Sequence, residues 1–416
     1  MFKRSLAFGV TLVSTLFLAA CGGGGMSAST PVLQPTATQP GAIAPLTTFR
    51  QQLAAGNFTQ VCGDPAPGEA RCFSYVLTES GRVALGKPGG GGGTVNGYGP
   101  ADLQAAYGLN TSGGAGRTVA VVDAYNAATL ESDLGVYRSH FGLPACTTAN
   151  GCFRKVNQTG GSTLPTNNAS WGQETSLDVD MVSANCPNCH ILVVEANSAS
   201  LADLSAGVNT AASLGAVAIS NSYGGSESST ETSNAAAYNH PGIAITASNG
   251  DSGYGAQSPA AFNTLTAVGG TALSRASNAR GWTETVWSGS GSGCSAYIAK
   301  PSWQHDANCA NRMIGDVAYI GDPNTGVAVY DSTPYQRSSG WLVFGGTSVG
   351  APAIAAVYAL AGTTVSDASY GYAHTTSFND VTNGSNGTCP FPYYCNGEVG
   401  YDGPTGNGTP AGLGAF

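Results

Sequence analysis

The chain has 416 residues, of which 42% are hydrophobic and only 9% charged, and its 24 Asp and Glu exceed its 15 Lys and Arg by nine. So few cations argue against a nucleic-acid groove, and the apolar fraction argues against disorder over most of the chain. The 60 glycines keep no three-residue period, which excludes collagen. The length allows one large α/β domain or two ordinary ones.

The N-terminus has the pattern of an export signal. A basic start precedes an apolar run from Leu6 to Ala20, and Cys21 follows. This predicts a signal peptide over residues 1–21, because the run is too short for a membrane-spanning helix. Its end, Leu18-Ala19-Ala20-Cys21, resembles the bacterial lipobox, so we expect an exported chain with a lipid anchor at Cys21. The alternative is an ordinary signal peptide that ends near a cysteine and leaves the protein extracellular.

Ten further cysteines form an even number, which in an exported chain indicates disulfides. Spacing does not prove connectivity. Local pairing would join Cys62 to Cys72, Cys146 to Cys152, Cys186 to Cys189, Cys294 to Cys309 and Cys389 to Cys395. The C-P-N-C stretch at residues 186–189 also fits a redox or zinc motif, but it has no second pair nearby, and a structural disulfide is favoured.

The residues that follow the signal divide the chain into segments. Residues 22–45 are rich in Gly, Ser, Thr and Pro, as in a flexible tether, and residues 48–85 are long enough for a small folded element. A glycine run at residues 89–93 predicts a linker. We therefore expect a tether and short prosegment over residues 22–97 and one main domain over residues 98–416.

In the main domain, apolar stretches of strand length alternate with helical patterns. We expect strands at residues 118–122, 191–195, 216–220, 243–247 and 264–268, and helices at residues 100–107, 129–141 and 198–214. Uninterrupted apolar strands that alternate with helices predict a parallel sheet covered on both faces. In such a sheet the functional site lies at the carboxyl ends of the strands.

Two segments carry groups suited to nucleophilic catalysis. In Gly345-Gly346-Thr347-Ser348, glycines precede a serine that opens a buried helix, where backbone amides can stabilise negative charge. The alternative is an ordinary helix cap. Glu174 and Asp178 are four residues apart on a predicted helix and share a face, so each raises the pKa of the other and one can act as a base in acid. The alternative is a solvated acidic face, which the apolar neighbours of the pair disfavour.

A third segment, S-N-G-D-S-G at residues 248–253, follows an apolar strand. Its Asp251 is either a turn residue that bonds its own backbone or a carboxylic acid that donates a hydrogen bond to an oxyanion. None of the five histidines has the setting of a catalytic base, and we expect them to be surface or structural residues.

Together these segments resemble the sedolisin (serine-carboxyl peptidase) family: E-x-x-x-D, S-x-G-D-S-G and G-T-S-x-x-x-P occur in that order. The resemblance covers roughly residues 98–416 and implies an α/β, subtilisin-like three-layer fold with a central, mostly parallel sheet flanked by helices. It implies Ser348 as nucleophile and Glu174 as general base and acid. It likewise implies that Asp178 orients Glu174 and that Asp251 stabilises the oxyanion.

Two C-terminal segments, residues 378–384 and 397–406, resemble the calcium site of the same family. By position, the implied ligands of one structural Ca²⁺ are the side chains of Asp380 and Asp402 and the carbonyls of Val381, Glu398 and Gly400. Carboxylates with backbone carbonyls suit this hard cation. The family usually has a small residue where this chain has Glu398. Without the resemblance, both aspartates would be interpreted as turn residues.

The chain also departs from the family pattern. Only about 75 residues separate the signal peptide from the main domain, which is short for a prodomain of the family and argues against self-inhibition by this segment. Asp123 ends an apolar strand as the aspartate of true subtilisins does, but no matching histidine accompanies it. We expect Asp123 to lie beside the site without a direct catalytic role.

Three functions are compatible with these observations. We expect a serine-type endopeptidase that hydrolyses peptide bonds at acidic pH. The alternatives are a catalytically inactive, lipid-anchored binding protein that kept the fold, and a histidine-dependent serine protease that uses Asp123. We expect protein or peptide substrates, no nucleic-acid partner, membrane contact only through Cys21, and a monomer.

Overall fold

The computed structural model describes residues 49–78, 81, 95–230 and 232–416. The predicted signal peptide, Cys21, the tether and the glycine linker lie outside these residues. All the described residues belong to one compact unit that spans Thr47–Phe416. In this part of the chain no helix is long and apolar enough to cross a membrane.

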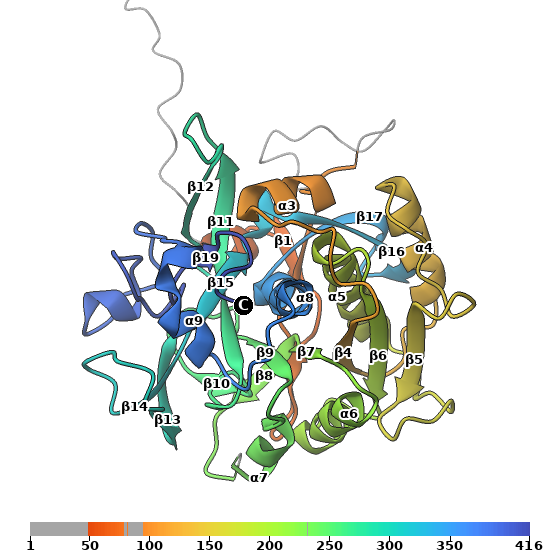
Figure 1. Ribbon diagram of the computed structural model, residues 1–416, viewed down its shortest axis with the longest axis horizontal. Coiled ribbons are helices and arrows are strands. Elements are labelled where there is room, and N and C mark those ends of the chain that lie inside the picture. Colours follow the sequence, from red (N-terminus) through yellow and green to blue (C-terminus); the bar gives the residue numbers. More distant parts are fainter. Residues whose placement is uncertain (1–48, 79–80, 82–94, 231) are drawn as a thin grey trace, which may run out of the picture. The chain divides into compact units, whose positions relative to one another are not determined.

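A central sheet of eight strands forms the core of the unit (Figure 1). Its order is β12-β11-β9-β7-β4-β6-β5, and β15 also pairs with β11. All neighbours are parallel except β11 and β12. The strands are β4 (Thr118–Ala124), β5 (Phe153–Asn157), β6 (His190–Ala196), β7 (Ala218–Asn221), β9 (Ala244–Ser248), β11 (Thr266–Arg275), β12 (Trp282–Val286) and β15 (Val317–Ile320).

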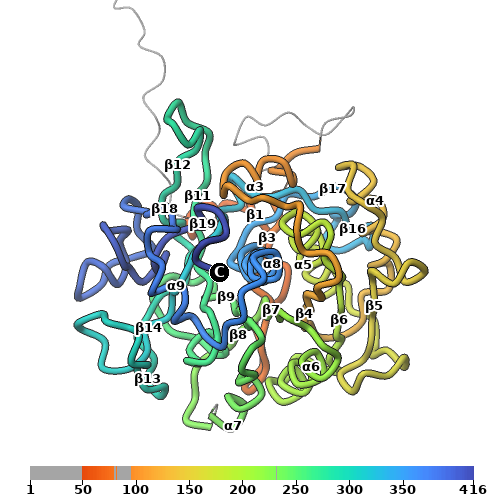
Figure 2. Tube along the Cα trace, in the orientation of Figure 1, coloured from red at the N-terminus to blue at the C-terminus, as the bar shows by residue number. Residues whose placement is uncertain are grey.

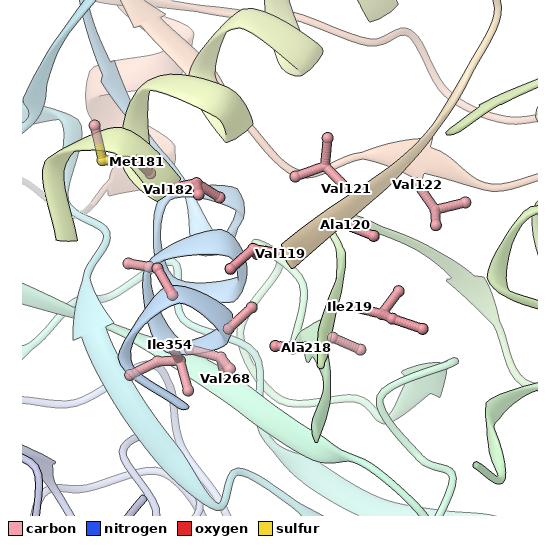
Figure 3. Close-up of a cluster of buried hydrophobic side chains, with 14 of the residues drawn as sticks. Val119, Ala120, Val121, Val122, Met181, Val182, Ala218, Ile219, Val268 and Ile354 are labelled. Atoms are coloured by element: carbon pink, nitrogen blue, oxygen red, sulfur yellow. The ribbon is translucent and has the colours of Figure 1, made fainter. Parts of the chain in front are cut away.

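Helices cover the two faces of this sheet. On one face α5 (Ala169–Asn185) and α8 (Gly350–Ala361) pack against each other and against β4, with α3 (Pro100–Tyr107) and α4 (Leu130–His140) beside α5. On the other face α6 (Leu201–Ser213) packs on β4, β6 and β7. Because side chains alternate along a strand, Val121 and Val122 extend from opposite sides of β4 (Figure 3). The apolar core therefore fills both spaces between sheet and helices.

The N-terminal described residues are built into two smaller antiparallel sheets. One has the order β1-β3-β17-β16, and the other has the order β10-β8-β2. Figure 2 follows this segment, in red, from β3 toward β8. The strands are β1 (Phe58–Gln60), β2 (Arg71–Cys72), β3 (Tyr75–Leu77), β8 (Tyr223–Ser226), β10 (Gln257–Ser258), β16 (Val327–Tyr335) and β17 (Ser338–Gly345). Strands β1, β2 and β3 lie in the segment that the sequence predicts to be a prosegment. This segment is therefore part of the same compact unit as the main domain.

Short elements complete the structure. They are α1 (Phe49–Ala54), α7 (Thr232–Ala235), α9 (Ser369–Ala373), the antiparallel pair β13 (Gly293–Ala299) and β14 (Asn311–Ile314), and the antiparallel pair β18 (Phe378–Asn379) and β19 (Thr409–Pro410). Several single-turn helices lie in the loops, among them η3 (Thr347–Val349) directly before α8.

The predicted α/β architecture is confirmed, and the predicted strands and helices lie within a few residues of their expected ends, except that β11 runs on to Arg275, seven residues beyond the expected end. The five local disulfides are confirmed as well, so the C-P-N-C stretch holds a structural bridge. Strand β5 and the hairpin of β16 and β17 were not expected. Strand β5 mixes apolar with charged residues, and in β16 and β17 the apolar runs, Val327–Tyr330 and Trp341–Phe344, are short and continue into polar, partly exposed residues.

Candidate active site

Ser348 lies in η3, at the turn between β17 and α8, and is fully buried. The turn depends on Gly346, whose φ of 108° is one that other residues rarely adopt. A Cβ on Gly346 would also lie 2.1 Å from the Phe73 carbonyl oxygen and 2.9 Å from Oδ2 of Asp251. Glycine is therefore required both for the turn and for the close approach of these two oxygens to the backbone at residue 346.

Glu174 and Asp178 project from α5, which begins where the Asn168 side chain accepts hydrogen bonds from the amides of Ser170 and Trp171. Every residue of α5 from Trp171 onward is buried. The helix is thus a core element, and its two carboxyl groups are removed from solvent. The alternative of a solvated acidic face is wrong.

The two carboxyl groups have hydroxyl partners. Ser222 Oγ, just beyond β7, donates to Asp178 Oδ1 at 2.8 Å, and Ser74 Oγ donates to Glu174 Oε2. The remaining oxygens, Glu174 Oε1 and Asp178 Oδ2, are buried without a hydrogen-bond partner among the described residues. Since ionised oxygens in such a setting are costly, protons must be shared within this cluster.

Burial raises the pKa of Glu174 well above its ordinary range, and the charge of Asp123 raises it further, while the nearby hydroxyls of Ser348 and Ser74 lower it. The pKa of Asp178 is raised by burial, then by Asp123 and Glu174. Asp123, at the carboxyl end of β4, has a pKa raised to about 7, chiefly by burial. The structure therefore brings Asp123 into one group of three buried carboxyls.

Asp251 follows β9, and its carboxyl lies against Gly346 and Thr347, the two residues that precede Ser348. Its Oδ1 accepts hydrogen bonds from the backbone amide of Thr347 at 2.8 Å and from its hydroxyl at 2.7 Å. Its Oδ2 is buried and has no hydrogen-bond partner among the described residues. Burial raises the pKa of Asp251 to about 7, so below that pH the carboxyl is protonated and can donate a hydrogen bond.

Three residues at this centre were not singled out from the sequence. The Ser222 carbonyl accepts from Ser348 Oγ at 3.0 Å, and the Phe73 amide donates to Ser348 Oγ at 3.0 Å. Ser74 is the third, through its bond to Glu174. The glycine pair that follows Ser222 after an apolar strand was an available signal. Nothing in the local sequence marks Phe73 or Ser74.

The histidines lie elsewhere. His190 is at the amino end of β6 and His240 precedes β9, so both are at the edge of the sheet opposite the carboxyl ends. His374 bonds to the carbonyl of Tyr370, while His140 and His305 are exposed. No histidine therefore stands where it would act as a base for Ser348.

The predicted calcium ligands also lie together. Asp402 Oδ2 accepts from the Glu398 amide at 3.1 Å, and Asp380 Oδ2 accepts from the Gly400 amide at 2.9 Å. Asp380, Glu398 and Gly400 line one pocket of about 640 Å³. No group of three or more His, Cys, Asp or Glu side chains in the described ranges could hold a metal, so an ion here would depend on carbonyls too. Two adjacent carboxylates with carbonyls nearby fit Ca²⁺.

The chain has similar proteins among those already known. No protein-family model matches the chain. Kumamolisin from Bacillus sp. (strain MN-32) is 29% identical over 362 residues, which are 76% of this chain and 62% of kumamolisin. Sedolisin from Pseudomonas sp. (strain 101) is 29% identical over 178 residues, which are 38% of this chain and 29% of sedolisin. The chain thus spans less than two thirds of the length of either relative.

Among solved structures, Pseudomonas sedolisin, a serine-carboxyl proteinase complexed with two molecules of pseudo-iodotyrostatin, superposes with a TM-score of 0.64 at 24% identity. The superposition covers 77% of this chain and 96% of that one. The chain is therefore similar in sequence to kumamolisin and sedolisin, and its α/β fold is the subtilisin-like fold of sedolisin.

Proposed function

We propose that this chain is a serine-carboxyl endopeptidase of the sedolisin family that hydrolyses peptide bonds in protein or peptide substrates at acidic pH. The observation that carries the proposal is the convergence of a buried serine with buried carboxyls that form no ion pair within the described part of the chain. Serine is a weak nucleophile without a base, and here the groups able to take its proton are carboxyls.

Each site residue then has a role. Ser348 Oγ attacks the substrate carbonyl and passes its proton to Glu174, which later gives a proton to the departing amine. Asp178 orients Glu174. The oxyanion accepts hydrogen bonds from the Ser348 amide and from Oδ2 of protonated Asp251, an oxygen that has no hydrogen-bond partner among the described residues.

The same groups explain why the enzyme should work in acid. Glu174 must be ionised in part, while Asp251 must stay protonated, and the pKa of Asp251 at about 7 sets the upper limit. Activity should follow a bell-shaped curve with its maximum below about pH 6. A histidine base would instead work best above about pH 6.5.

A pH profile on an unfolded protein substrate tests the proposal. Ser348→Ala and Glu174→Gln should each lose several orders of magnitude in kcat/KM, because nucleophile and base act as a unit. Glu131→Gln is the control, because Glu131 lies on α4 and its carboxylate accepts hydrogen bonds from Thr148. This variant should retain activity. Near-parental rates for Glu174→Gln, or a maximum above neutrality, would refute the carboxyl mechanism. A folded chain without Ser348-dependent hydrolysis would favour the inactive binding protein.

We also propose one structural Ca²⁺ at Asp380, Val381, Glu398, Gly400 and Asp402. Support comes from the pairing of the two aspartates with the residue 398–400 loop and from the pocket that this loop lines. The ion would neutralise two carboxylates that otherwise repel each other, and would thereby hold the C-terminal loops together.

Export is proposed on two grounds. The N-terminus resembles a lipoprotein signal with Cys21 as the lipidated residue, and five disulfides are typical of proteins from oxidising compartments. We propose that the protein is a monomer whose main domain spans residues 98–416 and follows a short prosegment. We also propose that it is anchored at the cell envelope or released outside the cell.

A further inference from the structure

The outer edge of strand β16 is covered by carboxyl side chains. Among the described strands, β16 lies at the end of its sheet, next to β17. Its amide at Tyr330 donates to Asp180 Oδ2 at 3.0 Å. Its amide at Ser332 donates to Asp133 Oδ2 at 3.0 Å, and the Ser332 hydroxyl donates to the same oxygen at 3.1 Å. Since the outward amides of an edge strand need acceptors, the two carboxyls take the place of a neighbouring strand.

These carboxyls come from the two helices that pack on β16. Asp133 belongs to α4 and Asp180 to α5, and both helices contact the strand (Figure 1). A third carboxyl, Asp331, belongs to β16 itself, and its Oδ2 accepts a hydrogen bond from Ser176 Oγ of α5 at 3.2 Å. Its Oδ1 accepts from the Thr333 amide at 2.5 Å. Hydrogen bonds thus run in both directions between α5 and β16.

This contact joins the element of the proposed nucleophile to the element of the proposed base. Strand β16 forms a hairpin with β17, and β17 leads into the turn that holds Ser348. Helix α5 carries Glu174 and Asp178, with Ser176 between them and Asp180 two residues beyond. A shift of β16 against α5 would therefore change how Ser348 faces Glu174. Displacements of about 1 Å between reacting groups can cost about 10²-fold in rate.

All three carboxyls are removed from water. The exposed fraction is 2% for Asp133 and 1% for both Asp180 and Asp331. Asp180 Oδ1 is buried without a hydrogen-bond partner among the described residues, and so is the hydroxyl of Tyr137, a residue of α4 that faces Asp180. Tyr319 of β15 faces Tyr137 in turn. The group therefore holds buried oxygens that a proton would satisfy and that a negative charge would not.

The charges that face Asp180 come from α4 and β16. Asp133 and Asp331 carry the like charge, and Arg138 of α4 carries the opposite one. The Arg138 guanidinium donates its hydrogen bonds to a serine hydroxyl and to two backbone carbonyls. Burial, first, and then the two like charges raise the pKa of Asp180 well above its ordinary range, while the Tyr330 amide and Arg138 lower it. Burial also raises the pKa of Asp331 to about 6.

The contact should therefore be stable in acid and weaken toward neutral pH. In acid the carboxyls share protons, so that few charges are buried together. As the pH rises through the raised pKa values, negative charges form in a site without water and repel each other. Because the folded pKa values lie above the ordinary ones, the stability that the contact contributes is present in acid and is lost as the pH rises.

We propose that Asp133, Asp180 and Asp331 form an acid-dependent latch that positions the hairpin leading to Ser348 against the helix that carries Glu174. The three residues are positioning residues, because they act through these two groups. This inference rests on the proposed function. It supplies a second reason for an acidic optimum, separate from the protonation of the carboxyl that faces the oxyanion.

Hydrogen exchange measured by mass spectrometry tests the latch without catalysis. The full chain with Ser348→Ala is compared with the same chain that also carries Asp180→Asn and Asp331→Asn, which keep acceptor oxygens but cannot ionise. Glu131→Gln, added to the Ser348→Ala chain, is the matched control on α4. The protection of peptides that cover β16, corrected for the intrinsic exchange rate at each pH, is divided by that of β4, which reports opening of the whole fold.

The relative protection of β16 should fall about tenfold or more from about pH 5 to about pH 8 in the Ser348→Ala chain and in the Glu131→Gln control. It should fall less than about threefold in the chain with both asparagines. Equal pH dependence of β16 and β4, or an unchanged fall with both asparagines, would overturn the latch. If that chain does not fold, Asp331→Asn alone must still reduce the fall.

Steady-state kinetics at acidic pH test positioning in chains that retain Ser348. Asp180→Ala removes the acceptor of the Tyr330 amide and should lower kcat about tenfold or more with KM within about twofold, whereas Asp180→Asn should retain the parental kcat. Parental kcat in Asp180→Ala, or equal losses in both variants, would overturn the positioning role. If Asp180→Ala does not fold, Ser176→Ala, which removes only the hydroxyl bonded to Asp331, must lower kcat at unchanged KM.

The two measurements separate the latch from the proposed function. The exchange pattern without Ser348-dependent hydrolysis in the parent would leave the contact between α5 and β16 and remove the proposed function. Ser348-dependent hydrolysis without the exchange pattern would leave the proposed function and remove the latch.

Discussion

The protonation of Asp251 makes a prediction about stability that is independent of catalysis. In the folded chain the pKa of Asp251 is raised from 3.8 to about 7 by burial, whereas the unfolded chain has the ordinary value. Between these pH values the folded state holds a proton that unfolding releases. The free energy of unfolding must therefore fall as the pH rises through this window.

The size of the effect follows from the pKa. Each pKa unit corresponds to about 1.4 kcal/mol, so Asp251 alone accounts for a loss of about 4 kcal/mol between about pH 4 and pH 8. This is a large share of the 5–15 kcal/mol or so that is typical of folded domains. Asp251→Asn removes the titration but keeps an oxygen that can accept from Thr347, so its stability should depend less on pH.

The assay is urea unfolding followed by tryptophan fluorescence at several pH values, in the Ser348→Ala chain to prevent self-digestion and at constant calcium. The difference in unfolding free energy, parent minus Asp251→Asn, should fall by about 4 kcal/mol from about pH 4 to pH 8. Asp64→Asn is the control, because its side chain is 92% exposed, and it should show no such trend. A difference that is constant or rises with pH would refute the protonated, buried state of Asp251.

Three other predictions follow from the site and the N-terminus. Asp123→Asn should cost little activity, because Asp123, with a pKa raised to about 7, is already uncharged at the acidic pH of maximum activity; a loss of several orders of magnitude in kcat/KM would contradict this. Chelation of calcium should lower Tm. Asp402→Ala should lower Tm equally and abolish the response to the chelator, and a Tm that the chelator does not change would refute the calcium proposal. Cys21→Ser should release the protein from the membrane fraction or block its processing, and unchanged membrane association would argue against lipidation.

Sequence alone determined the parts of this protein that depend on local pattern. Uninterrupted apolar strands between helices predicted the central sheet, because each such strand must be covered on both faces. The disulfides join cysteines that lie close together in the sequence, as the local pairing predicted. Glu174 and Asp178 were placed on one face of a helix by their spacing alone, and Asp251 and Ser348 by the glycine-rich turns that end a strand and open a helix.

Only the tertiary structure decided what lies opposite these groups. Phe73 reaches Ser348 across 275 positions of sequence, through pairing of β2 with β8 and of β3 with β17. Such pairing depends on backbone hydrogen bonds between distant strands and leaves no mark in the side chains of a two-residue strand. Asp123 likewise joins the buried carboxyls of α5 because the helix packs on β4, and its pKa follows from that burial. Local pattern thus indicated the candidate reacting groups, whereas long-range packing determined their burial, their protonation and which residues lie against them.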